Sequence, residues 1–307
     1  MSVGVQKRVL GGGSWPWVTM SLFVMVCLTW GTTWLGIKLA VATVPPMTAA
    51  GGRFLLAFPV FVLLAWRFKA PILWRQDQLG FFVISTLGYF GVPYLLINVG
   101  ELSISSGLAA LIFSTMPIWL LLFSVWFLGA PIRLRQVLGI LLGFFALVMI
   151  LWEQGSFGYQ NIWGGVMLFA AAIMHAAYYV YAKKHGAAIH PLTLNTLPVG
   201  VAALLLVSVG WWVESPNVAE FSGLSVVALL YLSLVASVLG FLAYFQLLKQ
   251  LSPITLSFVF LIFPVVAVVL SVWLEGKAVS LAFMAYLGLL LLGFALTRVK
   301  ADEGATS

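Results

Sequence analysis

Long apolar runs constrain this chain more strongly than any other feature of its sequence. About 20 apolar residues in a helix span the hydrocarbon core of a bilayer, whereas transmembrane barrels show alternating segments of about ten residues. Charged residues make up only 7% of the 307 residues, against about 25% in soluble domains. The sequence therefore predicts an all-α membrane protein with ten transmembrane helices, near residues 17–37, 46–66, 79–98, 105–128, 134–152, 163–182, 192–213, 224–248, 254–274 and 280–297.

The basic residues indicate how these helices are oriented. With the N-terminus in the cytoplasm, twelve of the 15 Lys and Arg residues lie inside, and only Lys38, Arg53 and Lys277 lie at external helix ends. The positive-inside rule favours this orientation, so we expect a multi-pass protein of the cell (inner) membrane with cytoplasmic tails at 1–16 and 299–307. Because the basic residues are spaced along the chain, their expected partner is the bilayer and not a nucleic acid. We expect Lys38 and Arg53 to snorkel to the headgroups; the alternative is attraction of an anionic group such as a carboxylate or phosphate.

The two halves of the chain resemble each other at a fixed spacing. At an offset of 147 residues, five identities relate the segment Pro117–Gly129 to Pro264–Gly276. Five spans per half is an odd number, so the two copies cross the membrane in opposite directions. Inverted repeats build alternating-access transporters with the substrate site near the midplane, whereas a duplication retained in a channel or scaffold is the alternative. We expect two inverted five-helix repeats, at residues 17–153 and 162–298.

A set of short motifs extends this pattern over nearly the whole chain. They are Trp30-Gly31 ahead of Lys38, the Arg53–Ala57 segment, Ser105–Ala110 followed by Pro117, and Ser237 through Tyr244 to Pro253. Together they resemble the EamA-type carriers of the drug/metabolite transporter superfamily. This resemblance implies ten spans, cytoplasmic termini and the export of small metabolites.

Within that superfamily, the length and the aromatic-rich spans are most similar to the YddG amino-acid exporters. That similarity implies neutral or aromatic amino acids as cargo. One family feature differs, since a Leu-Gly-Glu sequence often closes the fourth and ninth spans of these carriers. Here the chain reads Leu128-Gly129-Ala130 and Leu274-Glu275-Gly276, so no role of that glutamate is carried over.

Acidic residues are missing from the middle of every predicted span. A proton-coupled drug antiporter commonly relies on a buried carboxylate with a raised pKa, so this alternative function is disfavoured but kept. The lone Cys27 excludes a cysteine-rich metal site, and no catalytic constellation is present. We therefore expect a monomeric carrier of a small-molecule substrate, without cofactor or metal, and not an enzyme; a non-transporting scaffold is the remaining alternative.

One pair of residues is predicted to meet near the midplane. His175 is the only ionisable residue predicted near the middle of a span, and an offset of 145 pairs it with Trp30. Each lies eight residues before a lysine, about 12 Å along a helix, so the two approach the midplane from opposite sides. Neighbours at helical spacing share their faces. We expect these faces to line a central cavity, although an interhelical hydrogen bond of the histidine and simple aromatic packing would also explain them: Trp30, Thr33, His175, Tyr178 and Tyr179.

Further hydroxyl groups and two prolines complete the predicted site. A buried tyrosine combines apolar area with a donor that needs a partner, which suits a cavity for amphipathic zwitterions, but belt or core packing is the alternative. Proline in a helix removes a hydrogen bond and kinks it, so the equivalent mid-span prolines are candidate hinges, or passive bends. These candidates are Tyr89, Tyr94, Ser237 and Tyr244 for substrate binding, and Pro117 and Pro264 for the hinges.

Overall fold

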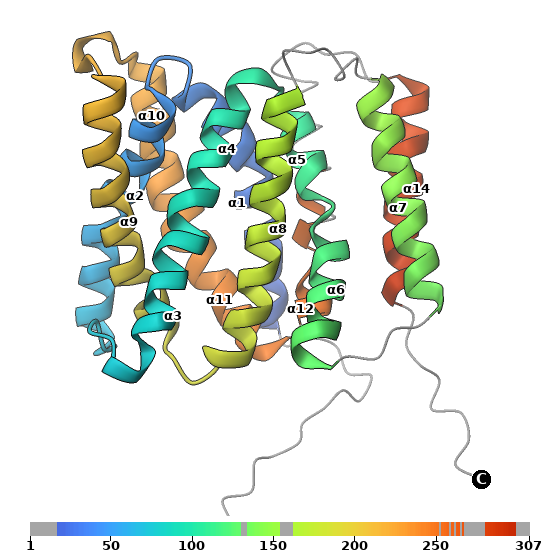
Figure 1. Ribbon diagram of the computed structural model, residues 1–307, viewed down its shortest axis with the longest axis horizontal. Helices are drawn as coiled ribbons and strands as arrows, with labels where there is room; N and C mark the ends of the chain where they lie inside the picture. The colour runs from blue at the N-terminus through green and yellow to red at the C-terminus, as the bar shows by residue number, and fades with distance from the viewer. Residues whose placement is uncertain are drawn as a thin grey trace, which may run out of the picture.

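The computed structural model describes most of the chain. The described residues are 17–129, 134–153, 162–251, 253–257, 259–260, 262–264, 266 and 280–298. No strand occurs among them, and the helices lie side by side along one common direction (Figure 1). In this part of the chain the prediction of an all-α protein is confirmed.

The first half contains five helical stretches. The third is unusual, because a π-helical segment, η2, interrupts it, and the fourth is divided into two helices. In chain order the elements are α1 (Trp17–Ala40), α2 (Pro46–Arg67), η1 (Gln76–Gln78), α3 (Leu79–Val83), η2 (Ile84–Gly91), α4 (Val92–Ser103), α5 (Ser106–Phe113), α6 (Met116–Leu128) and α7 (Leu134–Glu153).

The second half follows the same order where the structure describes it. Its third stretch also carries a π-helical segment, η4. The elements are α8 (Ile162–His185), α9 (Pro191–Glu214), η3 (Val218–Glu220), α10 (Gly223–Tyr231), η4 (Leu232–Leu239), α11 (Gly240–Gln250), α12 (Pro253–Leu256) and α14 (Leu281–Arg298).

Fewer than ten spans are established. Seven stretches of the described residues are long and apolar enough to cross a membrane, the first being Trp17–Ala40 and the last Gly223–Gln250. The fifth and tenth predicted spans contribute shorter apolar runs, Leu134–Ala146 and Leu281–Gly293. The ninth, predicted at 254–274, lies largely outside the described residues, so the count of ten stays a prediction.

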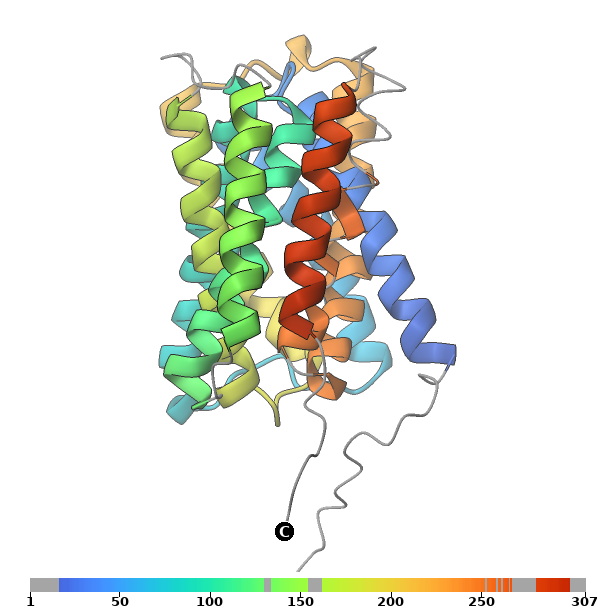
Figure 2. The ribbon, with the colours of Figure 1, turned by 90° about the vertical axis from the view of Figure 1, so that its right-hand side faces the viewer.

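The two halves run in opposite directions. Helix α8 begins at the end of the bundle opposite to the start of α1 (Figures 1 and 2). Helix α1 begins and α14 finishes at the same end, the lower end in Figure 2. This is the arrangement that an odd number of spans per half predicts.

Local sequence explains why equivalent helices start and stop at equivalent positions. Pro46 and Pro191 open α2 and α9, where proline has the right φ and its missing N–H leaves no bond unmade. Just after each of these helices one residue takes a left-handed conformation, Lys69 with φ 52° and Ser215 with φ 48°. Neither is a glycine, so both are rare backbone states that the two halves share.

Small residues allow the helices that surround the centre to approach closely. A Cβ atom on Gly100 of α4 would lie 2.9 Å from the Gly164 carbonyl oxygen of α8, and one on Gly51 of α2 would lie 2.7 Å from Val207 of α9. These contacts join helices of different halves. The α2–α9 pair is further held by Glu214, whose carboxylate accepts bonds from Met47 N (2.7 Å) and Thr48 N (2.8 Å) at the start of α2.

Candidate functional site

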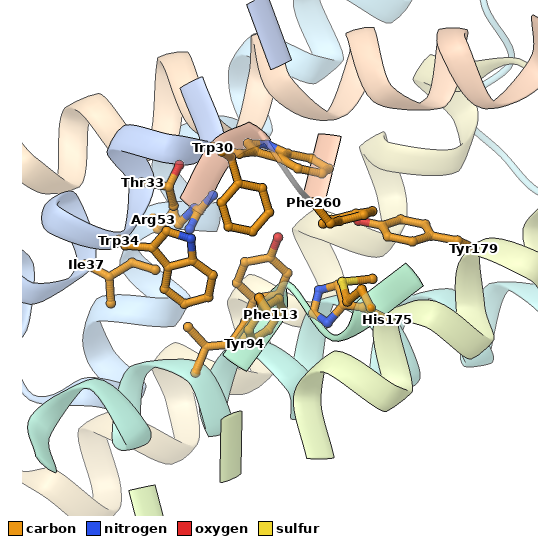
Figure 3. Close-up of a pocket in the computed structure, with 13 residues that line it drawn as sticks. Trp30, Thr33, Trp34, Ile37, Arg53, Tyr94, Phe113, His175, Tyr179 and Phe260 are labelled. Atoms are coloured by element: carbon orange, nitrogen blue, oxygen red, sulfur yellow. The ribbon is translucent and has the colours of Figure 1, made fainter. Parts of the chain in front are cut away.

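A small pocket with a cavity volume of about 50 Å³ lies between the two halves and is lined by residues of both. Its lining is mostly aromatic and aliphatic, with one cation and one histidine. Figure 3 shows the labelled side chains gathered around a common space, with Arg53 and His175 on different sides of it. The lining residues are Trp30, Thr33, Trp34, Ile37, Arg53, Tyr94, Ile97, Phe113, Met116, His175, Tyr179, Phe260 and Phe263.

Helix α1 presents one face to this pocket. Trp30, Thr33, Trp34 and Ile37 are spaced as neighbours on a helix surface. The Trp30 indole stacks on Tyr244 with ring centroids 4.8 Å apart, and its Nε1 donates to the Ala236 carbonyl at 3.3 Å. Trp30, one member of the predicted pair, therefore reaches the pocket. Its contacts with Ala236 and Tyr244, in the second half of the chain, fix its position.

His175 of α8 reaches the same pocket from the other half. It is 3% exposed, and its Nδ1 bonds to the Ala171 carbonyl oxygen at 2.8 Å. A carbonyl only accepts, so Nδ1 carries the hydrogen, and Nε2 of the neutral ring is left as an acceptor. The centroid of the His175 ring lies 5.3 Å from that of Tyr94 and 5.8 Å from that of Phe113. His175 thus offers the pocket an acceptor on a ring held by aromatic neighbours.

Arg53 is a pocket-lining residue that sequence reasoning misplaced. We expected it at the membrane surface, but its side chain is 2% exposed and lines the pocket. It lies seven residues into α2, about 10 Å along the helix, and its Nε donates to Ser237 Oγ at 2.7 Å. The positive-inside count assigns charges to sides of a membrane and does not tell which way a side chain points. The small residues just before it (Ala49, Ala50, Gly51 and Gly52) were the available signal that this part of α2 is packed inside.

The π-helical segments place polar atoms beside the pocket. Such segments are rare and often mark functional sites. In η4 the Ser237 hydroxyl donates to the Leu232 carbonyl five residues earlier, at 2.9 Å, while it accepts the bond from Arg53. The neighbouring Ala236 carbonyl accepts from Trp30. The equivalent segment η2 carries Tyr89, which is fully buried.

Four predicted residues lie behind the lining and not in it. The Tyr89 hydroxyl bonds to that of Tyr179 at 2.9 Å, and Tyr178 stacks on Tyr89 at 4.4 Å and donates to Ser85. Tyr244 packs against Tyr179 at 4.4 Å. The structure therefore brings five of the nine predicted binding residues to the pocket wall (Trp30, Thr33, Tyr94, His175 and Tyr179) and leaves Tyr89, Tyr178, Ser237 and Tyr244 supporting it.

The two equivalent lysines have a structural role that the sequence did not reveal. Lys38, expected to snorkel, donates from Nζ to the carbonyls of Glu101 (2.7 Å) and Ile104 (2.9 Å) at the end of α4. Lys183 does the same for Leu248 and Leu251 at the end of α11. Helix C-termini carry unsatisfied carbonyls and partial negative charge, so each half uses one lysine to cap its third stretch.

The predicted hinges differ in how they are placed. Pro117 is buried in the first turn of α6, immediately after the break at Ser114–Thr115 that divides the fourth stretch. Pro264 is buried and helical, but most of the chain that follows it lies outside the described residues. A hinge role stays a prediction for both. No cluster of His, Cys, Asp and Glu suited to a metal ion occurs in the described part of the chain.

Opposed helical halves with a pocket between them are typical of membrane transporters. The EamA-like transporter family matches this chain twice, at residues 17–152 and 162–299. The chain therefore belongs to the EamA-like transporter family, and both that family and its transporter-named relatives indicate a carrier and not an enzyme.

The relatives agree with this class. The chain is 39% identical over 287 residues to protein PagO of Salmonella typhimurium, covering 93% of this chain and 94% of PagO. It is 34% identical to an "uncharacterized transporter" of Buchnera aphidicola, covering 86% and 88%, and 28% identical to the "uncharacterized inner membrane transporter YedA" of Escherichia coli, covering 85% and 83%. One solved structure shares the fold with a TM-score of 0.72 at 18% identity, covering 91% of this chain and 96% of its own.

Proposed function

We propose that this protein exports neutral or aromatic amino acids by alternating access. The observation that carries the proposal is the pocket between the opposed halves, whose wall is built from the rings of Trp30, Trp34, Tyr94, Phe113 and Tyr179. Pockets for small molecules combine such apolar walls with a few placed polar groups, and here Arg53 and His175 supply them. The resemblance to the YddG exporters supports the substrate class and the outward direction.

The proposed arrangement follows the two matched segments. Residues 17–153 and 162–298 form the two five-helix repeats, with tails at 1–16 and 299–307. The basic residues favour cytoplasmic tails, and the name of YedA supports the inner membrane. The proposed working unit is a monomer, since the pocket forms between the two halves of one chain.

Flux from proteoliposomes tests this function. Vesicles with the purified protein are loaded with mixed labelled amino acids, and efflux is followed beside protein-free vesicles. We expect selective efflux of aromatic and other neutral amino acids. Efflux of none of them, or movement of lipophilic cations alone, would refute the proposal.

A matched pair of variants ties the flux to the pocket. Trp30→Ala removes a ring from the wall, whereas Trp212→Ala removes one that is 84% exposed on α9. We expect reduced efflux only for Trp30→Ala at equal protein levels. Equal efflux from both variants would remove the pocket from the transport path.

One observation favours a second candidate, a proton-coupled metabolite antiporter. Glu101 lies near the end of α4, which agrees with the prediction of acidic residues at helix ends, but it is fully buried. A buried carboxylate can exchange a proton during transport. An imposed pH gradient that drives flux in the wild type and not in Glu101→Gln would select this candidate.

A further inference from the structure

Arg53 stands out by its charge and its burial together. Its side chain is 2% exposed within a helix bundle that spans a membrane. Removing a guanidinium from water is costly unless the group is paired and hydrogen-bonded, and intramembrane charges mark substrate pathways by default. The interaction partners of Arg53 therefore determine whether its buried charge is stabilised.

The hydrogen bonds of Arg53 leave part of its guanidinium unused. Nε donates to Ser237 Oγ at 2.7 Å, but Nη1 is buried and has no partner among the described residues. A guanidinium has five N–H donors in a fixed plane, so a bond to one hydroxyl satisfies only a small part of it. The free edge belongs to a residue that lines the pocket.

No acidic side chain in the described part of the chain neutralises this charge. The ion pair found there joins Arg75 to Asp77, both exposed. Glu214 bonds to the start of α2, and Glu220 accepts from Asn217. Glu101 is buried near the end of α4 but forms no ion pair with Arg53. The described residues thus provide a buried cation without a carboxylate partner.

Aromatic rings hold the guanidinium in place. Its central carbon lies 5.1 Å from the Tyr94 ring and 5.7 Å from the rings of Phe54 and Phe241. Arginine at an aromatic face is attracted by the ring quadrupole, which fixes the plane without neutralising its charge. Arg53 is therefore oriented before any ligand arrives.

We propose that Arg53 is the carboxylate-binding residue of the pocket, so that the transported solute must carry a carboxylate beside its apolar part. This rests on the proposed function and adds the chemical group that the carrier selects. Arginine binds carboxylates through two parallel N–H···O bonds, and a solute carboxylate supplies the missing partner of Nη1. Ser237 is the positioning residue, because it holds Nε and leaves the outer edge free.

The rest of the lining favours a carboxylate over a phosphate. Arg53 is the one Lys or Arg among the lining residues, and a single positive charge balances a monoanion but not a phosphate dianion. Elsewhere the wall offers rings, hydroxyls and the acceptor Nε2 of His175. A solute with one carboxylate and an aromatic or aliphatic body matches this distribution.

The first experiment uses the wild-type protein and so does not depend on a variant folding. Uptake of labelled phenylalanine into proteoliposomes is competed with phenylalanine, phenylalanine amide, phenethylamine and phenyl phosphate. We expect competition by phenylalanine and at least roughly tenfold weaker competition by the two compounds without an anionic group. Equal competition by the amide, or stronger competition by phenyl phosphate, would overturn the carboxylate assignment.

The second experiment assigns the effect to Arg53. We expect Arg53→Gln to raise the half-saturating phenylalanine concentration by roughly tenfold or more and to abolish the preference for phenylalanine over its amide. Arg53→Lys keeps the charge without the planar fork and should recover part of the preference, while Ser237→Ala should weaken it. Arg67→Gln, at the exposed end of the same helix, is the control and should change neither.

The failures are distinguishable. If no amino acid moves at all, the proposed function fails. If phenylalanine moves but its amide competes equally, or if folded Arg53→Gln keeps the full preference, only the role of Arg53 fails.

Discussion

Replacement of Gly240 by alanine tests the position of the Trp30 indole. A Cβ atom at Gly240 would lie 2.6 Å from Trp30 Nε1 and 3.2 Å from its Cδ1. The backbone of Gly240 is ordinary right-handed helix, with φ −61° and ψ −49°, so alanine introduces no backbone strain. The consequence of Gly240→Ala therefore depends on whether the indole is where the structure places it.

The expected change in the free energy of unfolding follows from the contacts that the Trp30 indole would lose. Overpacking costs about 1–3 kcal/mol, and the bond from Nε1 to Ala236 and the stack on Tyr244 contribute about 1 kcal/mol each. Alanine returns about 1 kcal/mol of helix propensity. We therefore expect Gly240→Ala to lower the free energy of unfolding by about 2–4 kcal/mol. Gly165→Ala, where nothing lies within 4 Å of the new Cβ, should instead be neutral or stabilising.

The chain contains a natural reporter for this measurement. Cys27 is its only cysteine and is 3% exposed, so a thiol-reactive fluorophore labels it on thermal unfolding. The midpoint should fall for Gly240→Ala and not for Gly165→Ala, and Trp30→Phe should relieve part of the loss because it removes Nε1. A Gly240→Ala protein as stable as the wild type, or losses that simply add in the double variant, would show that Trp30 does not occupy this position.

Three further predictions use the same protein. Lys183→Met removes the cap from the carbonyls at the end of α11 and should lower the free energy of unfolding by about 2 kcal/mol, whereas Lys69→Met at an exposed position should not; equal midpoints would argue against the cap. Partial burial and the charge of Lys249 lower the pKa of His190 from 6.5, and its neutral Nδ1 accepts from Leu192 N at the start of α9. Because the folded pKa is the lower one, this stabilisation is present above pH 6.5 and is lost as the pH falls through the lowered pKa; the acid-side fall in unfolding midpoint should therefore flatten in His190→Asn, and an unchanged slope would refute the cap. Tyr179→Phe, which breaks the hydrogen bond to Tyr89, should raise the half-saturating concentration of aromatic substrates, whereas Tyr286→Phe should not. Identical saturation curves would leave that hydroxyl without a role in binding.

Pocket-lining residues were predictable where one helix face carries them. Trp30 and Thr33 share a face of α1, and His175 and Tyr179 share one of α8, so helical spacing and the repeat offset together led to them. The same reasoning overextended to Tyr178 and Tyr244, which face inward but meet other rings before the pocket. Periodicity indicates that a side chain points to the interior, but it does not tell how deep the layer in front of it is.

Phe260 and Phe263 were missed for a different reason. They belong to a long apolar run in which nearly every residue is hydrophobic, so no face is marked by polarity. Trp34 and Ile37 were also not among the predicted residues, but their helical spacing from Trp30 would have placed them on the same face of α1. No comparable signal distinguishes the phenylalanines.

What the sequence alone indicated about this protein is where its apolar helices lie along the chain and that its two halves run in opposite directions. In a bilayer every backbone polar group must be satisfied within its own segment, so the length of each apolar run and the charges beside it are local information. Only the tertiary structure decided which partners the charged side chains reach. Whether Arg53 reaches lipid headgroups or Ser237, and whether Lys38 reaches water or the end of α4, depends on the neighbouring helix that each side chain meets, because a cation is stabilised by partners that can lie far away in the chain.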